Sequence, residues 1–238
     1  MKFIGKLKTE NQMQKVFVQF KELFEKRYSL INVSKLGEDS IRYDFFTALR
    51  EIKKLEPWQL QVEYSVNDGT FIPRMTKGSK RKENPQVDLW VDEDSLKLCV
   101  EFGFFRRNSN DKGSISVTEN IFKMLNDFIR IAIQSKTNTS SAYFICVADE
   151  KMLNKELYKY SGFENFPAPQ YVFDWKIVKT LVDAYTSAKK IDTRFLQIME
   201  KLKMEITAKQ IFKQEIFSKI NTFKTEVLIW EVTSTTEN

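Results

Sequence analysis

Histidine is absent from this sequence of 238 residues. A chain without histidine cannot build a Ser-His-Asp triad, a Cys-His pair or a zinc site with histidine ligands. Hydrolysis by these residues would therefore depend on carboxylates, lysine and a metal ion. Cysteine is nearly absent too: only Cys99 and Cys146 occur, both within apolar segments and without a metal-binding or disulfide spacing. We expect both to be buried free thiols in a reducing compartment.

Long apolar runs and nucleotide-binding loops are also missing. No apolar segment approaches the ~20 residues that a membrane-spanning helix requires, and the first residues lack the apolar region of a secretory signal. We therefore expect a cytoplasmic protein with no membrane partner. The sequence contains neither G-x-x-x-x-G-K-[ST] nor G-x-G-x-x-G, so no nucleotide cofactor is expected.

Glycine and proline are scarce, at 7 and 5 residues, whereas phenylalanine occurs 20 times. This balance favours helices and packed aromatic side chains over a turn-rich all-β fold. The residues are 42% hydrophobic and 29% charged, which is typical of a globular chain. The length fits one large domain, or a core with an appended helical part.

Basic residues slightly outnumber acidic ones, with 38 against 32 and a net charge of +6. This surplus permits a polyanionic partner without requiring one. The placement of the basic residues is more informative, because they flank a pair of carboxylates in the middle of the chain. The candidates for nucleic-acid binding are Lys80, Arg81, Lys82, Arg106, Arg107 and Asn108. The alternative is an ordinary solvated loop.

Two apolar runs, residues 87–91 and 96–105, are separated by turn-forming polar residues and predict a β-hairpin. Each run contains one carboxylate, Asp88 or Glu101, where a core strand should be apolar. Burying an unpaired ionised carboxylate costs several kcal/mol, so the pattern indicates a bound cation. Mg²⁺ is suitable because it takes one or two protein carboxylates and keeps several waters. The alternative is that the strand aspartate is a local cap beside a turn.

The same hairpin resembles a nuclease motif. The run P-Q-V-D, which ends at Asp88, and the run C-V-E-F-G around Glu101 are similar to the P-D…(D/E)-x-K signature of the PD-(D/E)xK nuclease superfamily. Many type II restriction endonucleases belong to this superfamily. Gly103 stands where the motif has its lysine. Some members take that lysine from the following helix, and Lys123 matches the rearranged form. The opening helix of the superfamily often brings a glutamate to the metal site, and Glu38 matches that position loosely.

The resemblance covers about residues 38–148 and implies an α/β fold, with a restriction-endonuclease-like core in the order α-β-β-β-α-β and a mixed central sheet flanked by helices. Apolar periodicity predicts the elements of this order: a helix from about 39 to 56, strands at 58–66, 87–91 and 96–105, a helix at 118–134 and a strand at 141–148. It also predicts additional N- and C-terminal elements, namely helices at 9–28 and 175–189, one or two helices across 192–221, and a short strand at 227–230. We expect a single nuclease-like domain over residues 1–238, with a core at 38–148 and a helical C-terminal part at 149–238.

Three charged residues of the predicted helix 118–134 share one stripe, since Lys123, Asp127 and Arg130 follow each other at i, i+4 and i+7. One interpretation is an ordinary surface ion pair between the lysine and the aspartate. The other is that the Lys123 ammonium faces Glu101 across the first turns of the helix.

The function implied by the resemblance is that of a Mg²⁺-dependent endonuclease, with Mn²⁺ as a substitute, that cuts double-stranded DNA as a homodimer in a restriction-modification system. Asp88 and Glu101 would hold the metal, Glu38 would be an outer or second-metal ligand, and Lys123 would orient the attacking water or neutralise the transition state. Two alternatives remain open. One is a nuclease-like module for DNA binding or protein assembly without cleavage, and the other is a repair, resolvase or phage-defence nuclease.

Overall fold

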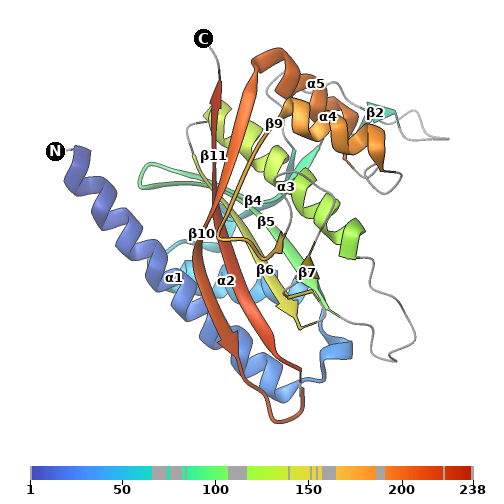
Figure 1. Cartoon of the computed structure of the whole chain (residues 1–238). Coiled ribbons are helices and arrows are strands. Elements are labelled where there is room, and N and C mark those ends of the chain that lie inside the picture. Colours follow the sequence, from blue (N-terminus) through green and yellow to red (C-terminus); the bar gives the residue numbers. More distant parts are fainter. Residues whose placement is uncertain are drawn as a thin grey trace.

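The computed structural model describes residues 2–65, 74–75, 82–83, 85–106, 117–138, 140–150, 152–153, 155–156, 165–185, 191–221 and 223–236. The described elements form a twisted sheet with helices packed on both of its faces (Figure 1).

The central sheet is mixed and has seven strands. In spatial order they are β1 (Gln61–Ser65), β4 (Gln86–Glu93), β5 (Leu96–Phe105), β6 (Ser141–Asp149), β11 (Thr225–Thr236), β10 (Met204–Ile216) and β9 (Gln170–Asp174). Strands β5 and β6 are parallel, and every other neighbouring pair is antiparallel. Two further antiparallel pairs lie outside this sheet: β2 (Arg74–Met75) with β3 (Lys82–Glu83), and β7 (Lys155–Glu156) with β8 (Asn165–Phe166).

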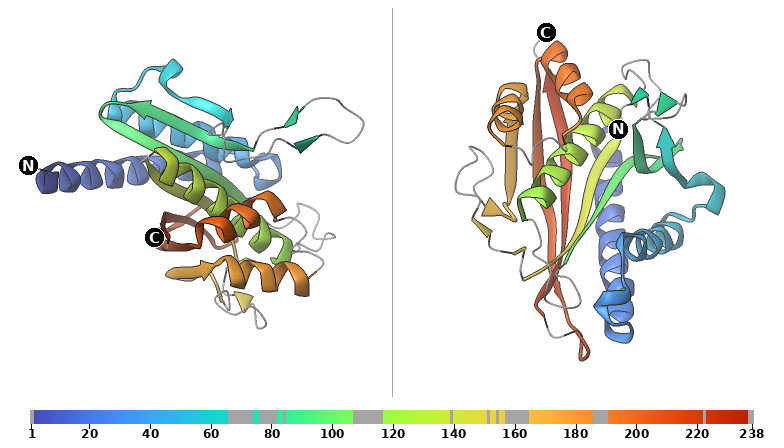
Figure 2. Two further views of the ribbon diagram at one scale, coloured as in Figure 1. Left: turned by 90° about the horizontal axis from the view of Figure 1, so that it is seen from above. Right: turned by 90° about the vertical axis from the view of Figure 1, so that its right-hand side faces the viewer.

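Helices cover both faces of the sheet. Helices α1 (Lys2–Leu30) and α2 (Glu38–Lys53) lie on one side, and α3 (Val117–Asn138), α4 (Trp175–Ala184) and α5 (Thr193–Leu202) lie on the other (Figure 2). The 3-10 helices η1 (Val33–Lys35) and η2 (Pro57–Gln59) follow α1 and α2. In the part of the chain that the structure describes, no helix has the length and apolar character needed to span a membrane.

A separate apolar core lies on each face of the sheet. The core under α1 and α2 contains Phe20, Phe45 and Phe102, and the core under α3 and α5 contains Phe128 and Trp230. All five side chains are fully buried. Burial of each such side chain contributes about 1.5–3 kcal/mol relative to its exposed state, so the abundant phenylalanines form the interior on both faces.

Strand β5 lies in the middle of the sheet between these two cores. Val100 and Phe102 belong to the core under α1 and α2, whereas Cys99 and Phe105 belong to the core under α3. Coverage on both faces explains why this strand reads as a nearly continuous apolar run. Glu101, which is only 2% exposed, is therefore a carboxylate inside a core strand.

Between residues 38 and 149 the main elements follow the predicted order: α2, then the antiparallel strands β1, β4 and β5, then α3 and β6. Helix α3 is the crossover connection that a parallel neighbour of β5 requires. The protein is thus a mixed α/β structure with a seven-stranded mixed sheet flanked by helices.

The prediction of helix across residues 203–216 was wrong, because this segment is the 13-residue strand β10. Its buried residues Met204, Ile206 and Ala208 alternate with exposed or half-buried ones, which is the period of a strand. Helix α5 ends at Leu202, and its C-cap residue Lys203 has a left-handed φ of 48°. Pairing with β9 and β11 overrides the helix propensity of the Lys and Gln residues.

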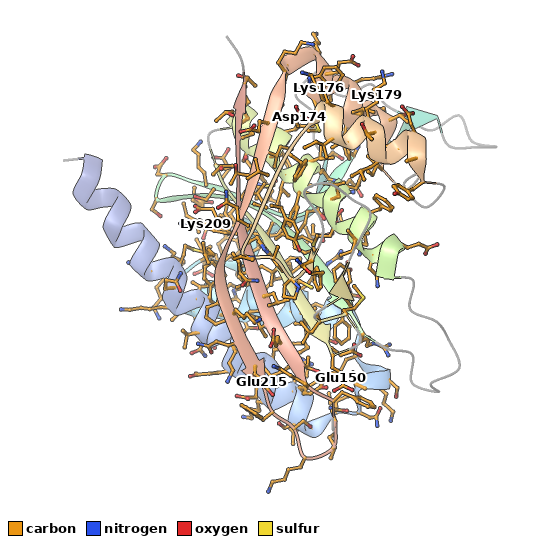
Figure 3. All side chains as sticks on the ribbon, in the orientation of Figure 1. Glu150, Asp174, Lys176, Lys179, Lys209 and Glu215 are labelled. Atoms are coloured by element: carbon orange, nitrogen blue, oxygen red, sulfur yellow. The ribbon has the colours of Figure 1, made fainter. Side chains whose placement is uncertain are left out.

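The C-terminal part is consequently not helical as a whole. Strands β9, β10 and β11 come from residues 170–236 and complete the central sheet, and β11 is paired as far as Thr236. Figure 3 shows Lys209 and Glu215 along β10, and Lys176 and Lys179 on α4. The charged residues of β10 therefore occupy exposed or half-buried positions of a strand.

Candidate active site

The hairpin of β4 and β5 brings Asp88 and Glu101 to neighbouring positions. Leu89 is opposite Val100 in the antiparallel register, so the two carboxylates occupy the next pair along the ladder. Oδ2 of Asp88 accepts a hydrogen bond of 2.9 Å from the backbone N–H of Phe102. The side chain of Asp88 is 14% exposed, which leaves it at the edge of the buried region.

Arg130 of α3 is the cation that contacts Glu101. Its Nη1 lies 2.6 Å from Oε1 of Glu101 and donates a second hydrogen bond of 3.1 Å to the carbonyl oxygen of Gln86. Its Nη2 lies 3.4 Å from Oδ1 of Asp127, one turn earlier on the same helix. The guanidinium also lies 5.8 Å from the ring centre of Phe195 on α5. Arg130 thus joins α3 to both strands of the hairpin.

Helix α2 contributes a second set of charges from its first two turns. Its N-cap is Gly37, so Glu38 is the first helical residue and Arg42 follows one turn later. Nη2 of Arg42 lies 3.0 Å from Oε1 of Glu38 and 2.5 Å from Oδ1 of Asp88. Oε2 of Glu38 lies 2.6 Å from Nζ of Lys123 on α3. Two helices and the hairpin therefore meet in one network.

We call this network the charge cluster; it consists of Glu38, Arg42, Asp88, Glu101, Lys123, Asp127 and Arg130. It contains all four residues that the sequence singled out for catalysis. One interpretation of the sequence placed the Lys123 ammonium against Glu101. In the structure Lys123 contacts Glu38 instead, and the cation that contacts Glu101 is Arg130. Asp127 is only 2% exposed and is not part of a surface ion pair.

Burial is the main influence on the two buried acids of the charge cluster, Glu101 and Asp127. Burial raises the pKa of Glu101 well above its ordinary value; Arg130 opposes this shift, and the carboxylates of Asp88 and Asp127 add to it. Burial also raises the pKa of Asp127 to about 7, although Arg130 and Lys123 act in the opposite direction. In both acids, burial favours the protonated, neutral form, and the neighbouring cations only partly offset it.

The pKa of Lys123, a cation of the charge cluster, is also shifted. Burial lowers the pKa of Lys123, but Glu38 and Asp127 more than offset this effect, and the pKa lies above its ordinary value. The carboxylate of Asp88 contributes to the same rise. Lys123 therefore stays protonated near neutral pH, and it is close enough to Asp88 of the hairpin to interact with it electrostatically.

Three buried polar atoms of the charge cluster have no hydrogen-bond partner: Nε of Arg42, Oδ2 of Asp127 and Nε of Arg130. Buried polar atoms are nearly always paired, with protein groups or with ordered water or ions. Three exceptions in one cluster indicate a place where water or a ligand belongs.

The donor set at Asp88 and Glu101 fits a magnesium ion in its chemistry. Mg²⁺ prefers oxygen ligands and is held by one or two carboxylates together with several waters. Within the described residues, no group of three or more His, Cys, Asp or Glu side chains is arranged to hold a metal. Glu38 is separated from Asp88 by the guanidinium of Arg42 and is not a third ligand in this arrangement.

Gly103 leaves little room for a side chain such as the lysine of the nuclease motif. A Cβ atom at this position would lie 3.0 Å from Cζ of Phe144 and 3.1 Å from Cζ of Phe105. Two aromatic rings therefore fill the space that a side chain at position 103 would need. The lysine of the charge cluster is Lys123, which lies on α3.

Most of the residues predicted to bind nucleic acid lie outside the described residues: Lys80, Arg81, Arg107 and Asn108, together with the side chain of Lys82. Arg106 is described. It directly follows β5, and its guanidinium lies 5.5 Å from the ring centre of Phe104.

Three members of the charge cluster were not predicted from the sequence to be site residues: Arg42, Asp127 and Arg130. The signals were present, since Arg42 lies four residues after Glu38, and Asp127 and Arg130 share a stripe with Lys123. What the sequence could not supply was the packing of α2 and α3 against the hairpin.

Comparison of the chain with protein-family models, with curated proteins and with solved structures found no match.

Proposed function

We propose that this protein is a Mg²⁺-dependent endonuclease that hydrolyses phosphodiester bonds of double-stranded DNA and resembles the type II restriction endonucleases of the PD-(D/E)xK superfamily. One observation carries the proposal. Asp88 and Glu101 lie side by side on β4 and β5, and the flanking helices add Glu38 and Lys123 to the same charge cluster.

Asp88 and Glu101 would hold the metal ion, with Mn²⁺ as a substitute for Mg²⁺. When bound, such an ion lowers the pKa of a coordinated water and stabilises the charge that develops on the scissile phosphate. The protein's own groups fix the two carboxylates. The N–H of Phe102 holds Oδ2 of Asp88, and Arg130 holds Oε1 of Glu101. This support limits the rotation of both side chains, which favours a preorganised site.

Lys123 would supply the positive charge that the motif normally takes from position 103. Its side chain is 44% exposed, so the ammonium can reach a bound phosphate while Glu38 holds it in place. A preorganised cation beside the attacked phosphorus stabilises the transition state more than the ground state. Glu38 is then a positioning residue for Lys123, in addition to its proposed place as an outer ligand.

The remaining elements of the proposal follow from the resemblance. The basic residues at 80–82 and 106–108 would contact DNA phosphates, and a homodimer would match a palindromic target. Cys99 and Cys146 are both free and buried, which is compatible with the reducing cytoplasm that we propose as the compartment.

A second candidate function is a nuclease-like DNA-binding or assembly module without cleavage activity. The observation that favours it is the pairing within the charge cluster. Arg42 and Arg130 already occupy Asp88 and Glu101, and position 103 carries no lysine. If Asp88 and Glu101 only form ion pairs with these arginines and bind no metal, the cluster stabilises the fold and does not catalyse a reaction.

Incubation of the protein with plasmid and phage DNA, with Mg²⁺ or with EDTA, separates the two functions. Discrete fragments that require Mg²⁺ would indicate sequence-specific cleavage, and a smear would indicate a non-specific nuclease. Asp88→Asn should abolish either pattern. Intact DNA in every reaction, together with retained DNA binding, would favour the inactive module.

A further inference from the structure

Arg42 binds three carboxylates at once. Its guanidinium contacts Glu38 at 3.0 Å and Asp39 at 3.5 Å, both on its own helix, and Asp88 at 2.5 Å on β4. Asp88 is the residue of this set that belongs to the proposed metal site. The side chain of Arg42 is 20% exposed, so it lies at the rim of the charge cluster.

A guanidinium on Asp88 and a divalent cation at the same carboxylate would repel each other. The repulsion is strong because the two positive charges would be only a few ångströms apart in a partly buried place, where screening by water is weak. Occupation of Asp88 by Arg42 therefore opposes metal binding.

Arg42 can leave Asp88 without losing all of its partners. Glu38 and Asp39 lie four and three residues before it on α2, at spacings that pair side chains on one helix face. Asp39 is 75% exposed, so a shift of the guanidinium towards it moves positive charge outwards. Two arrangements are thus available to one side chain, and they differ in whether Asp88 is occupied.

An independent observation shows that the present arrangement is not fully satisfied. Nε of Arg42 and Oδ2 of Asp127 are buried without a hydrogen bond, and the Asp127 side chain is only 3% exposed. The charge cluster therefore contains a buried donor on Arg42 and a buried acceptor on Asp127 that its present pairing leaves unsatisfied.

We propose that Arg42 determines the affinity of the Asp88–Glu101 pair for a divalent cation: it occupies Asp88 in the absence of the metal, and it shifts towards Glu38 and Asp39 when the metal binds. The inference rests on the proposed metal site, and it makes Arg42 a competitor of the metal rather than a simple structural ion pair.

The test is calorimetric titration of the protein with Mg²⁺ and with Ca²⁺ in the absence of DNA. Arg42→Gln should bind the cation more tightly than the parent by at least about fivefold, the low end of typical coupling between two ligands of one protein. The stabilisation against heat that the cation produces should also be larger in the variant.

Arg27→Gln is the matched control. Arg27 makes two bonds of 2.7 Å to Asp44, a buried carboxylate that also lies on α2 but outside the charge cluster. Like Arg42→Gln, this substitution breaks an ion pair between an arginine and a carboxylate. It therefore shows how much of any change in cation affinity comes from loss of stability alone. Its cation affinity should equal that of the parent, whereas Asp88→Asn should not bind the cation.

Equal or weaker cation binding by Arg42→Gln would overturn the inference, and so would the absence of cation binding in both proteins. The outcomes separate this inference from the proposed function. DNA cleavage by a parent whose cation affinity does not depend on Arg42 would refute only the inference. Tighter cation binding by Arg42→Gln, with no DNA cleavage by the parent, would refute only the nuclease.

A second measurement follows Arg42 in the parent protein itself. In the parent protein, the NMR signal of the Arg42 Nε–H group should shift during titration with Ca²⁺, and the signal of Arg27 should not. Arg42→Lys assigns the signal. A constant Arg42 signal at saturating Ca²⁺ would show that the guanidinium does not move, and would refute the inference.

Discussion

Nζ of Lys123 on α3 lies 2.6 Å from Oε2 of Glu38 on α2, although the two residues are 85 positions apart in the sequence. This contact closes the charge cluster between the two helices that flank the hairpin. The lysine is also within electrostatic range of Asp88, and its side chain is 44% exposed to solvent.

Lys123→Ala should bind DNA nearly as well as the parent and cut it about 10²- to 10³-fold more slowly, because removal of a preorganised charge affects the transition state more than the ground state. Single-turnover cleavage and DNA-binding assays measure the two effects separately. Lys136→Ala is the control, since Lys136 is an exposed residue near the other end of α3 that contacts Thr236. Cleavage at the parental rate by Lys123→Ala would remove this lysine from the mechanism.

Arg130→Met should destabilise the protein by about 3–5 kcal/mol, the usual cost of leaving buried partners without their counter-ion. The loss concerns two carboxylates, because both Glu101 and Asp127 are buried and contact this guanidinium. Urea denaturation of parent and variant at pH 8 gives the difference in the free energy of unfolding. Lys97→Ala, which removes an exposed pair with Asp92, should leave the midpoint unchanged. A midpoint for Arg130→Met close to that of the parent would show that the two acids are neutralised by other means.

Asp127 should make the stability depend on pH in a specific direction. Its pKa is about 7 in the folded protein, whereas an ordinary aspartate has a pKa of about 4. Between these values the folded state holds the proton more tightly than the unfolded chain does. The free energy of unfolding therefore falls as the pH rises through this window, and below it Asp127 is protonated in both states.

Asp127→Asn removes this titration and keeps the shape of the side chain. The stability of the variant relative to the parent should increase from pH 4 to pH 7 and then become constant. Urea denaturation at several pH values measures the difference. A difference that does not change with pH would mean that Asp127 titrates normally in the folded protein.

Gly103→Lys restores the residue of the nuclease motif but should destabilise the protein by about 1–3 kcal/mol, because the new side chain overlaps a packed core. The rings of Phe105 and Phe144 are the groups that must move. Gly103→Ala, which adds only the Cβ, should have a smaller effect. Thermal or urea denaturation provides the comparison. A Gly103→Lys variant as stable as the parent would show that the two rings yield easily and that the glycine is not required by packing.

Local periodicity was sufficient to predict the hairpin and its two carboxylates. Asp88 and Glu101 belong to apolar runs joined by a short polar turn, and the register of β4 with β5 depends on little more than that turn. Helix α3 was predictable for a similar reason, because its apolar stripe and the charged stripe through Lys123 both recur with the helical period.

Strand β10 shows where local patterns failed. Residues 204–216 contain lysine, glutamate and glutamine, which favour a helix in isolation, but the segment pairs with β9 on one side and β11 on the other. Strand propensity depends on such neighbours more than on the residues themselves. Strand β10 therefore could not be assigned from the residues of this segment alone.

By itself, the sequence determined that two carboxylates occur in core strands and that a lysine, an aspartate and an arginine share one face of the next helix. Only the tertiary structure decided which charges meet. Arg42 is 46 residues from Asp88, and Arg130 is 29 residues from Glu101, so these contacts depend on how α2 and α3 pack against the sheet. The packing is set by the apolar faces of the helices, which carry no information about the partners of the charged side chains at their edges.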